Sequence, residues 1–209
     1  FIHVSGGNTI KRGSSMPAPG TSPAPHAHSS EGIKKHVNIP VATVARINEP
    51  WIAEELIANE KCDMCMIGRP NLCDSEFANK AFEGKVDDIR PCIGCGRCLT
   101  GIMMGKRISC TVNPSVEDDT IAPAETKKKV LVIGGGPAGM EAAYVAKKRG
   151  HEVVLCEKSN ELGGQLRLAA VPIAKQELCK VIKFMIRRLD HEGIEVRLNT
   201  EVTKDPSRV

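Results

Sequence analysis

The chain has 209 residues, enough for one large domain or two small ones, and 41% of them are hydrophobic, which is the composition of a globular protein. The net charge is only +4, aromatic residues make up 3%, and Lys127 to Lys129 form the one local basic run, so a nucleic-acid-binding surface is not expected. No apolar run approaches the ~20 residues of a membrane span, and no secretion signal is visible. The chain starts without Met and stops just after a strand-like segment, so we interpret it as an internal fragment.

The first part of the chain predicts alternating strands and helices. Residues 1–4 are a strand-like apolar run, residues 8–30 a loop rich in Pro, Gly and Ser, and residues 31–37 a short helix capped by Ser29 or Ser30. Further elements follow: strands over 39–45 and 62–68, a helix from Pro50, and a helix from Asp74 or Ser75 to Phe82. Repeated strand–helix units imply a parallel sheet. They do not decide between an open sheet and a closed barrel.

Residues 90–114 carry four cysteines in an unusual spacing: Cys92, Cys95, Cys98 and Cys110. Three thiolates at three-residue intervals on a tight loop converge on one point. A cubane cluster has four iron atoms, so each of these thiolates can bind one iron and the distant fourth thiolate, that of Cys110, can bind the last. Gly94 and Gly96 let the backbone wrap closely around such a cluster. Structural zinc is the alternative, but zinc sites usually pair their ligands in two C-x₂₋₄-C knuckles and Cys110 stands alone. The spacing therefore predicts a 4Fe-4S cluster.

The remaining cysteines are predicted to be structural. Cys62 and Cys65 lie within an expected strand, where they would point to opposite faces of the sheet as core thiols. Cys73, Cys156 and Cys179 have no visible partners in the sequence, and we interpret them as buried or incidental. A reducing compartment fits both this cysteine usage and the absence of an export signal.

The second part of the chain reads as a polar linker and then a second set of strands and helices. The expected strands cover 128–134, 151–158 and 193–202, and the expected helices cover 136–150 and 175–192. Gly134-x-Gly136-x-x-Gly139 follows the first of these strands and opens a helix, which is the context of a dinucleotide-binding turn. Gly134 makes the turn, Gly136 lets the backbone approach a pyrophosphate, and Gly139 lets the helix pack on the strand. Glu157 ends the next strand, close to the ~20-residue offset expected of a ribose-hydroxyl acceptor, which favours NAD or FAD over NADP.

Taken in order, these motifs resemble the old-yellow-enzyme-like iron–sulfur flavoenzymes. That family includes 2,4-dienoyl-CoA reductase, enoate reductase, trimethylamine dehydrogenase and the bile-acid-inducible NADH-dependent 3-oxo-Δ4-steroid reductases. The resemblance runs through IHVSGG, IPVATVARINEP, DMCMIGRPNL, the cysteine segment, and GGGPAGMEAA with ELGGQ. It implies an α/β fold in four parts: the C-terminal units of an FMN-binding (β/α)₈ TIM barrel (1–89), the iron–sulfur segment (90–114), a linker (115–126), and the start of a Rossmann-like FAD/NAD(P)-binding domain (127–209).

The resemblance also implies binding residues. Arg46, Gly68 and Arg69 would hold the FMN phosphate, since loops after the last two strands of such barrels bind phosphate, although many relatives have glycine at the position of Ala45. The residues implied for FAD and NAD(P)H are Gly134, Gly136, Pro137, Ala138, Gly139, Glu157, Lys158, Gly164 and Gln165.

The catalytic acid stays unknown. Some dienoyl-CoA reductases carry a histidine shortly after the first strand of this segment, where this chain has Asn8, Thr9 and Ile10. His26 and His28 fit a solvated helix entrance better than a substrate contact. For His3, a core position and a place near the flavin both stay open.

The function implied by the resemblance is NAD(P)H-dependent reduction of an activated C=C bond in an unsaturated carbonyl or thioester. Electrons would pass from NAD(P)H to FAD, the 4Fe-4S cluster, FMN and the substrate. The alternatives are an amine dehydrogenase of the trimethylamine type and an electron-transfer module without FMN. We expect a cytoplasmic protein without nucleic-acid or membrane partners, compatible with a homo-oligomer at full length. Three of eight barrel units leave a sheet edge open, so the isolated chain should bind FMN poorly.

Overall fold

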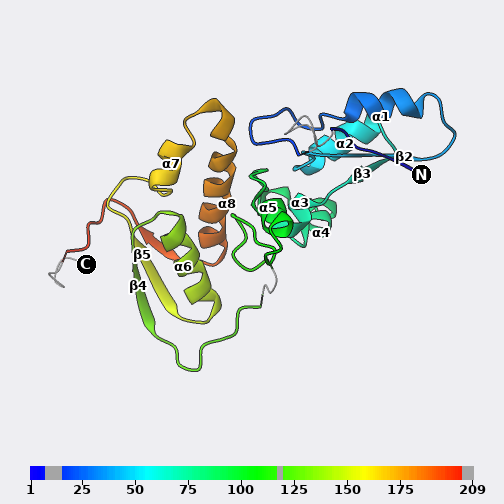
Figure 1. The fold of residues 1–209 in the computed structure, drawn as a ribbon. Coiled ribbons are helices and arrows are strands. Elements are labelled where there is room, and N and C mark those ends of the chain that lie inside the picture. The colour runs from blue at the N-terminus through cyan, green and yellow to red at the C-terminus, as the bar shows by residue number, and fades with distance from the viewer. Residues whose placement is uncertain (8–15, 117–119, 204–209) are drawn as a thin grey trace. The chain divides into compact units, whose positions relative to one another are not determined.

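The computed structural model describes residues 1–7, 16–116 and 120–203, which form two compact units, Phe1–Glu117 and Asp118–Val209 (Figure 1). Each unit contains a three-stranded parallel sheet together with helices, so the α/β class with parallel sheets is confirmed. The border between the units falls inside the segment 115–126 that the sequence predicts as a linker. Among the described helices, none combines the length and the apolar character needed to cross a membrane.

The first unit is built on the strand order β1-β2-β3, in which Ile2 faces Val41 and Ala42 faces Met64. The central strand is buried at Val41, Ala42 and Thr43, as expected of a parallel strand covered on both faces. The elements of this unit are β1 (Ile2–Val4), α1 (Ala27–Lys34), β2 (Val41–Val44), α2 (Pro50–Ala58), β3 (Met64–Met66), α3 (Arg69–Cys73), α4 (Phe77–Phe82), η1 (Val86–Asp88) and α5 (Arg97–Met103).

The apolar face of α2 lies over a small core cluster. Leu56 of this helix packs with Ala24, Ile47 and Cys62, and Ile52 and Ala53 border the same cluster. Proline at the first helical position fits the entry of α2, because its missing N–H would have no helical partner there. The carboxylate of Asp63 connects the strands to α1, since it accepts from the amide of Val41 at 2.8 Å and from Lys34 Nζ at 2.7 Å.

Several elements differ from the predicted ones. α1 begins at Ala27 after His26 and not behind a serine cap, because the hydroxyl of Ser30 is buried and donates to the carbonyl of Ala27 inside the helix. The strand predicted over 62–68 covers only Met64–Met66, so the prediction that Cys62 and Cys65 point to opposite faces of one strand is wrong. Cys62 lies before the strand, and its Sγ is 3.8 Å from Cys65 Sγ.

The second unit has the strand order β4-β5-β6 with α6 and α8 next to each other beside the sheet (Figure 1). Met140 and Ala143 of α6 and Leu189 of α8 are buried in its core with Leu155 and Cys156 of β5. The elements of this unit are β4 (Lys129–Ile133), α6 (Pro137–Lys148), β5 (Glu152–Cys156), α7 (Gln165–Ala169), η2 (Ile173–Lys175), α8 (Glu177–His191) and β6 (Glu195–Arg197).

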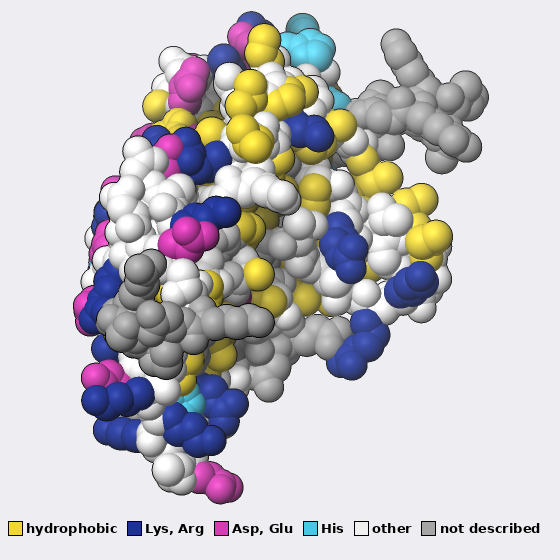
Figure 2. All heavy atoms as spheres, turned by 90° about the vertical axis from the view of Figure 1, so that its left-hand side faces the viewer, with side chains coloured by type: hydrophobic (Ala, Val, Ile, Leu, Met, Phe, Trp, Pro, Cys, Tyr) yellow, Lys and Arg dark blue, Asp and Glu magenta, His cyan; other side chains and the backbone are white. Residues whose placement is uncertain are grey.

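On the face drawn in Figure 2, basic and acidic side chains both occur, together with apolar side chains that reach solvent. Among the exposed apolar residues of the second unit, Leu168, Val171 and Ile173 follow one another around α7 and η2. Ile133 at the end of β4 is also exposed.

Candidate functional site

The carboxyl ends of β2 and β3 border a cavity of about 270 Å³. Arg46, Gly68 and Arg69, the three residues that the resemblance implies for the FMN phosphate, all line this cavity. Arg46 lies two residues after the end of β2 and is only 5% exposed, whereas Gly68 and Arg69 open α3 after β3. The carboxyl edge of a parallel sheet is where ligands of α/β folds usually bind, and the chain thus brings two guanidinium groups to that edge.

The backbone that carries Arg46 is strained. Ala45 has φ +84° and Arg46 has φ +49°, so two consecutive residues with side chains lie in the left-handed region. Each such residue costs about 1–2 kcal/mol relative to a right-handed conformation, and strain of this kind gathers at functional sites. The left-handed backbone at Ala45 and Arg46 therefore indicates a functional site. Neither the composition nor the periodicity of the sequence reveals this conformation.

The cysteine segment lies against the same cavity. Gly94 has φ +64°, and a Cβ atom at this position would come within 2.5 Å of Arg46 Nη1. Arg69 Nη1 donates to the carbonyl of Gly94 at 3.4 Å, and Asn48 Nδ2 donates to the carbonyl of Cys92 at 3.0 Å. The arginines predicted to hold a phosphate therefore contact the loop predicted to hold a cluster. Sequence reasoning missed Asn48, because an asparagine after a strand gives no local indication of its distant partner.

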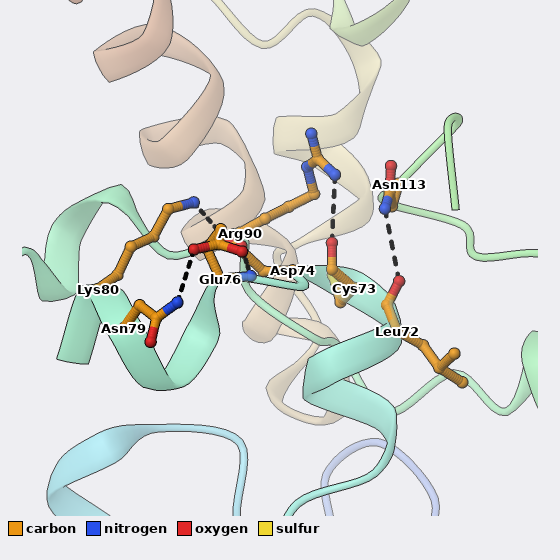
Figure 3. A network of polar contacts seen from close by, with 8 residues as sticks. All are labelled: Leu72, Cys73, Asp74, Glu76, Asn79, Lys80, Arg90 and Asn113. Atoms are coloured by element: carbon orange, nitrogen blue, oxygen red, sulfur yellow. Dashed lines mark hydrogen bonds and ion pairs between the residues drawn. The ribbon is translucent and has the colours of Figure 1, made fainter. Parts of the chain in front are cut away.

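Both ends of the cysteine segment are attached to the end of α3 (Figure 3). Arg90 Nη1 donates to the carbonyl of Cys73 at 3.2 Å, and Asn113 Nδ2 donates to the carbonyl of Leu72 at 3.4 Å. These are carbonyls of the last helical turn, which have no partner within the helix. Asp74, only 6% exposed, accepts from the amide of Arg90 and from Lys80 Nζ, each at 2.7 Å. Residues 90 and 113 are thereby held at one place, so the segment between them closes into a loop.

Cys92 and Cys110 on this loop, and Cys73 at the end of α3, have very different environments. The hydrogen bond from the Cys73 side chain, with the amides of Asn113 and Val112, lowers the pKa of Cys110 from 9.0 to about 6 against the effect of burial. The same bond to Cys110, together with burial, raises the pKa of Cys73 far above 9.0. Burial raises the pKa of Cys92 to about 11, although the Gly94 amide donates to its sulfur. Of these three thiols, Cys110 is the one whose surroundings favour the thiolate.

The four predicted ligands share this loop but do not form a closed cage. Cys95 Sγ lies 3.2 Å from Thr111 Oγ1, and Cys98 is buried within α5. Over residues 1–7, 16–116 and 120–203, no three histidine, cysteine, aspartate or glutamate side chains are grouped closely enough to hold a metal ion. The four thiols nevertheless share a loop that is closed at both ends, and their ligation of a cluster stays a prediction. Sequence reasoning missed Cys73, which contacts Cys110 from a different element.

The glycine-rich turn of the second unit forms a compact cradle at the start of α6. Gly134 has φ +101°, and a Cβ on Gly139 would collide with the carbonyl oxygen of Gly134. The amide of Gly163 donates to the carbonyl of Gly135 at 2.8 Å, and Gly164 packs against Gly136. The predicted residues Gly134, Gly136, Gly139 and Gly164 are therefore brought together. Pro137 and Ala138 form the exposed first turn of α6, while Lys158 and Gln165 are exposed beyond the cradle.

Glu157 lies at the base of this cradle and is only 8% exposed. Its carboxylate accepts from the amide of Gly135 at 2.6 Å and from the amide and hydroxyl of Ser159, each at 2.8 Å. These bonds, those of Ser159 and Gly135 first, lower the pKa of Glu157 below 4.5, so the group is an anion at neutral pH. A carboxylate accepts about four hydrogen bonds, and one acceptor position is left for a further donor.

The histidines do not reveal a catalytic acid. His26 packs over Gly6, where a Cβ would collide with its ring, and His28 is exposed beside Ser29. His3 is exposed on β1, which does not fit the core position, one of the two places that the sequence leaves open for it. Residues 8–10, where the sequence lacks the expected histidine, lie outside the described residues. Cys156 is buried in β5 and Cys179 is exposed on α8.

Comparison with known proteins places this geometry in a family. Residues 129–203 match the family model described as FAD dependent oxidoreductase. Similar curated proteins include NADH oxidase of Thermoanaerobacter brockii (43% identical, 86% of this chain and 28% of that protein), bilirubin reductase of Mediterraneibacter gnavus (41%, covering 95% and 32%) and cinnamate reductase of Clostridium sporogenes (39%, covering 84% and 27%).

Solved structures agree with these relatives. 2-Naphthoyl-CoA reductase superimposes with a TM-score of 0.90 at 33% identity over 96% of this chain and 31% of that chain. Histamine dehydrogenase from Rhizobium sp. 4-9 superimposes with a TM-score of 0.83 at 26% identity, over 90% of this chain and 29% of that chain. The chain thus spans about a third or less of the length of each of these proteins. The matches confirm the resemblance carried by the motifs: the chain belongs to the old-yellow-enzyme-like flavin and iron–sulfur oxidoreductases.

Proposed function

We propose that the chain is part of an NAD(P)H-dependent flavin and iron–sulfur oxidoreductase that reduces an activated C=C bond. The observation that carries the proposal is the contact between the cavity of Arg46 and Arg69 and the loop of Cys92 and Gly94. A phosphate-bearing flavin at this cavity and a cluster on this loop would be neighbours, which electron transfer between them requires. The cinnamate reductase and NADH oxidase relatives favour an NADH-dependent reductase.

In this proposal the first unit supplies the last strand–helix units of an FMN-binding (β/α)₈ barrel. Arg46 and Arg69 would bind the FMN phosphate, because guanidinium groups match phosphate in charge and bidentate geometry. Gly68 leaves open space at the start of α3, because a Cβ atom at this position would have no described neighbour within 4 Å. Phosphate binding after the last two strands is common to barrels of this type.

The cysteine loop and the glycine cradle would hold the other two groups. Cys92, Cys95, Cys98 and Cys110 would ligate a 4Fe-4S cluster. The cradle from Gly134 to Gly139 would hold the pyrophosphate of FAD at the start of α6, with Gly164 closing against Gly136 and Glu157 accepting a ribose hydroxyl. Bound nicotinamide, flavins and cluster would supply hydride and single-electron transfer, while the protein binds and orients them.

The substrate class we propose is an unsaturated carbonyl compound or thioester, in which the C=C bond is conjugated and therefore accepts hydride. We further propose that the protein works in the reducing cytoplasm, where thiols stay available for a cluster. Nucleic acid and membranes are not proposed as partners, and a homo-oligomer of the full-length protein is compatible with the fold.

A direct assay tests this function on the protein at its full natural length. After anaerobic purification, NADH and cinnamate are supplied, and the saturated acid is measured by mass spectrometry. We expect product from the wild type and a loss of at least tenfold in Arg46→Ala, because the flavin phosphate loses a charged partner worth about 1.5–3 kcal/mol. Arg149→Ala, which removes an exposed arginine of the second unit, is the matched control and should keep wild-type activity.

Amine oxidation is the second candidate, favoured by the match to histamine dehydrogenase. It predicts that the protein oxidises a primary or methylated amine with an artificial electron acceptor and consumes no NADH. That outcome, without formation of saturated acid from cinnamate, would contradict the reductase proposal.

A further inference from the structure

The cavity at the carboxyl edge of the first sheet has walls from separate parts of the chain. Arg46 and Asn48 follow β2, and Arg69 opens α3. Pro17 belongs to the long loop before α1, and Leu99 belongs to α5 within the cysteine segment. A group bound in this cavity would therefore lie next to segments that are far apart in sequence.

The guanidinium group of Arg69 joins two of these walls. Its Nη1 donates to the carbonyl of Pro17 and to the carbonyl of Gly94, each at 3.4 Å. A guanidinium group carries its N–H donors in one plane, so Nε and Nη2 remain to bind an anion in the cavity while Nη1 keeps both carbonyls. An anion held by Arg69 would fix the orientation of this plane and thereby strengthen the two long hydrogen bonds.

Asn48 makes a second connection between the cavity and the cysteine segment. The residue lines the cavity, and its Nδ2 donates to the carbonyl of Cys92 at 3.0 Å. Gly94 is buried beside Arg46, whose Nη1 would lie 2.5 Å from a Cβ atom at position 94. The backbone from Cys92 to Gly94 thus lies directly against side chains that border the cavity.

The ends of the cysteine loop are held at a different place. Arg90 and Asn113 donate to carbonyls at the end of α3 (Figure 3), and neither residue is among those that line the cavity. The part of the loop next to the cavity is positioned instead by Asn48 and Arg69. A change in the cavity can therefore shift this part of the loop while the two ends stay in place.

We propose that Asn48 and Arg69 are positioning residues that couple the binding of a phosphate group in the cavity to the position of the cysteine loop, and that Arg69 also couples it to the segment at Pro17. The coupling is reciprocal, because the free energy that bound phosphate adds to these contacts is the same free energy that the contacts add to phosphate binding. The inference rests on the proposed function, since the phosphate would be that of FMN. Flavin binding would then set the position of the loop beside it.

Hydrogen exchange read by mass spectrometry tests this coupling in the full-length protein. The protein is purified anaerobically, freed of flavin, and measured with and without saturating inorganic phosphate. Inorganic phosphate is the probe because it lacks the flavin ring and cannot cover the loop directly. Exchange of the β2 amides shows whether each variant is folded.

Two variants and one control separate the two contacts. Asn48→Ala removes the bond to the Cys92 carbonyl and leaves both arginines in place. Arg69→Lys keeps a positive charge but replaces the planar donors by a single ammonium group, which cannot hold two carbonyls and an anion together. Asn71→Ala is the matched control, because the Asn71 amide also donates to a carbonyl, that of Ile67 at 2.8 Å, but Asn71 is not among the residues that line the cavity.

In the wild type and in Asn71→Ala, phosphate should slow the exchange of amides in 16–22 and 92–99 by about fivefold, the effect of one hydrogen bond of average net strength. Asn48→Ala should keep this slowing at 16–22 and show clearly less of it at 92–99. Arg69→Lys should bind phosphate more weakly and lose the slowing at 16–22.

The outcomes that contradict the coupling are distinct from those that contradict the phosphate site. Slowing only in the segments that line the cavity, 44–48 and 66–70, would overturn the inference and leave the phosphate site in place. Equal slowing at 92–99 in Asn48→Ala and the wild type would also overturn it. A folded wild type in which phosphate slows no amide would overturn the phosphate site, and with it the flavin-binding part of the proposed function.

Discussion

Ala45 and Arg46 form the turn after β2 with positive φ angles, although neither residue has the conformational freedom of glycine. Their left-handed backbone directs the Arg46 side chain into the buried wall of the cavity at the carboxyl edge of the sheet. We infer that packing against neighbouring residues holds this turn in its left-handed conformation, because the backbone preferences of alanine and arginine do not favour it.

Ala45→Gly should therefore stabilise the protein. The substitution relieves about 1–2 kcal/mol of left-handed strain and loses about 0.4–1 kcal/mol through the more flexible unfolded chain. The net gain in unfolding free energy should be roughly 0.5–1 kcal/mol, read from the midpoint of urea unfolding. Ala42→Gly, in the buried middle of β2, is the control and should lower the unfolding free energy of the protein. Equal destabilisation by both changes would show that Ala45 is not strained.

The C-x-x-C pair should be chemically inert despite its resemblance to a redox motif. Burial and the neighbouring Cys62 raise the pKa of Cys65 to about 12. A thiol with a raised pKa stays protonated at pH 8 and is a poor nucleophile. Iodoacetamide at pH 8, followed by peptide mass spectrometry, should label the exposed Cys179 and leave Cys62 and Cys65 unlabelled in the folded protein. Labelling of Cys65 as fast as Cys179 would contradict this expectation.

At the scale of elements, the end of α3 and the turn into α4 form the anchor of the cysteine loop. Asp74→Ala removes the acceptor of the Arg90 amide and of Lys80, and leaves a buried donor without its partner. The cost should be about 1–3 kcal/mol, measured by thermal unfolding. Glu83→Ala is the control, because its ion pair with Lys85 is exposed to solvent and should contribute little to stability. If both variants unfold at the wild-type temperature, Asp74 does not anchor the loop.

The glycine cradle offers a pair of substitutions that separates folding from binding. Gly139→Ala should destabilise the second unit, because its Cβ would collide with the Gly134 carbonyl. Gly136 has φ −73°, and a Cβ atom added to it would have no described neighbour within 4 Å, so the fold should tolerate Gly136→Ala. If the cradle binds a pyrophosphate, Gly136→Ala should still weaken FAD binding at least tenfold in flavin fluorescence titrations, since the backbone must approach the phosphates closely. Unchanged FAD affinity in Gly136→Ala would support a strand–turn–helix without a dinucleotide.

At the scale of the whole molecule, the elements with strong local patterns were predictable. Apolar runs marked β2 and β5, and the glycine spacing marked the turn before α6. The five-residue helix α3 was not predictable, because it is too short to show a helical period. Cys73 and Asn48 were missed for a second reason: their partners Cys110 and Cys92 are far away in sequence, and only the closed loop brings them together.

The most direct test of the central proposal is the metal content of the anaerobically purified protein, with Cys110→Ala in parallel. Iron, zinc and acid-labile sulfide are measured per chain. We predict about four irons and four sulfides in the wild type, and loss of the cluster in Cys110→Ala. About one zinc without sulfide would contradict the cluster, because the loop would then be structural and no electron could pass through it.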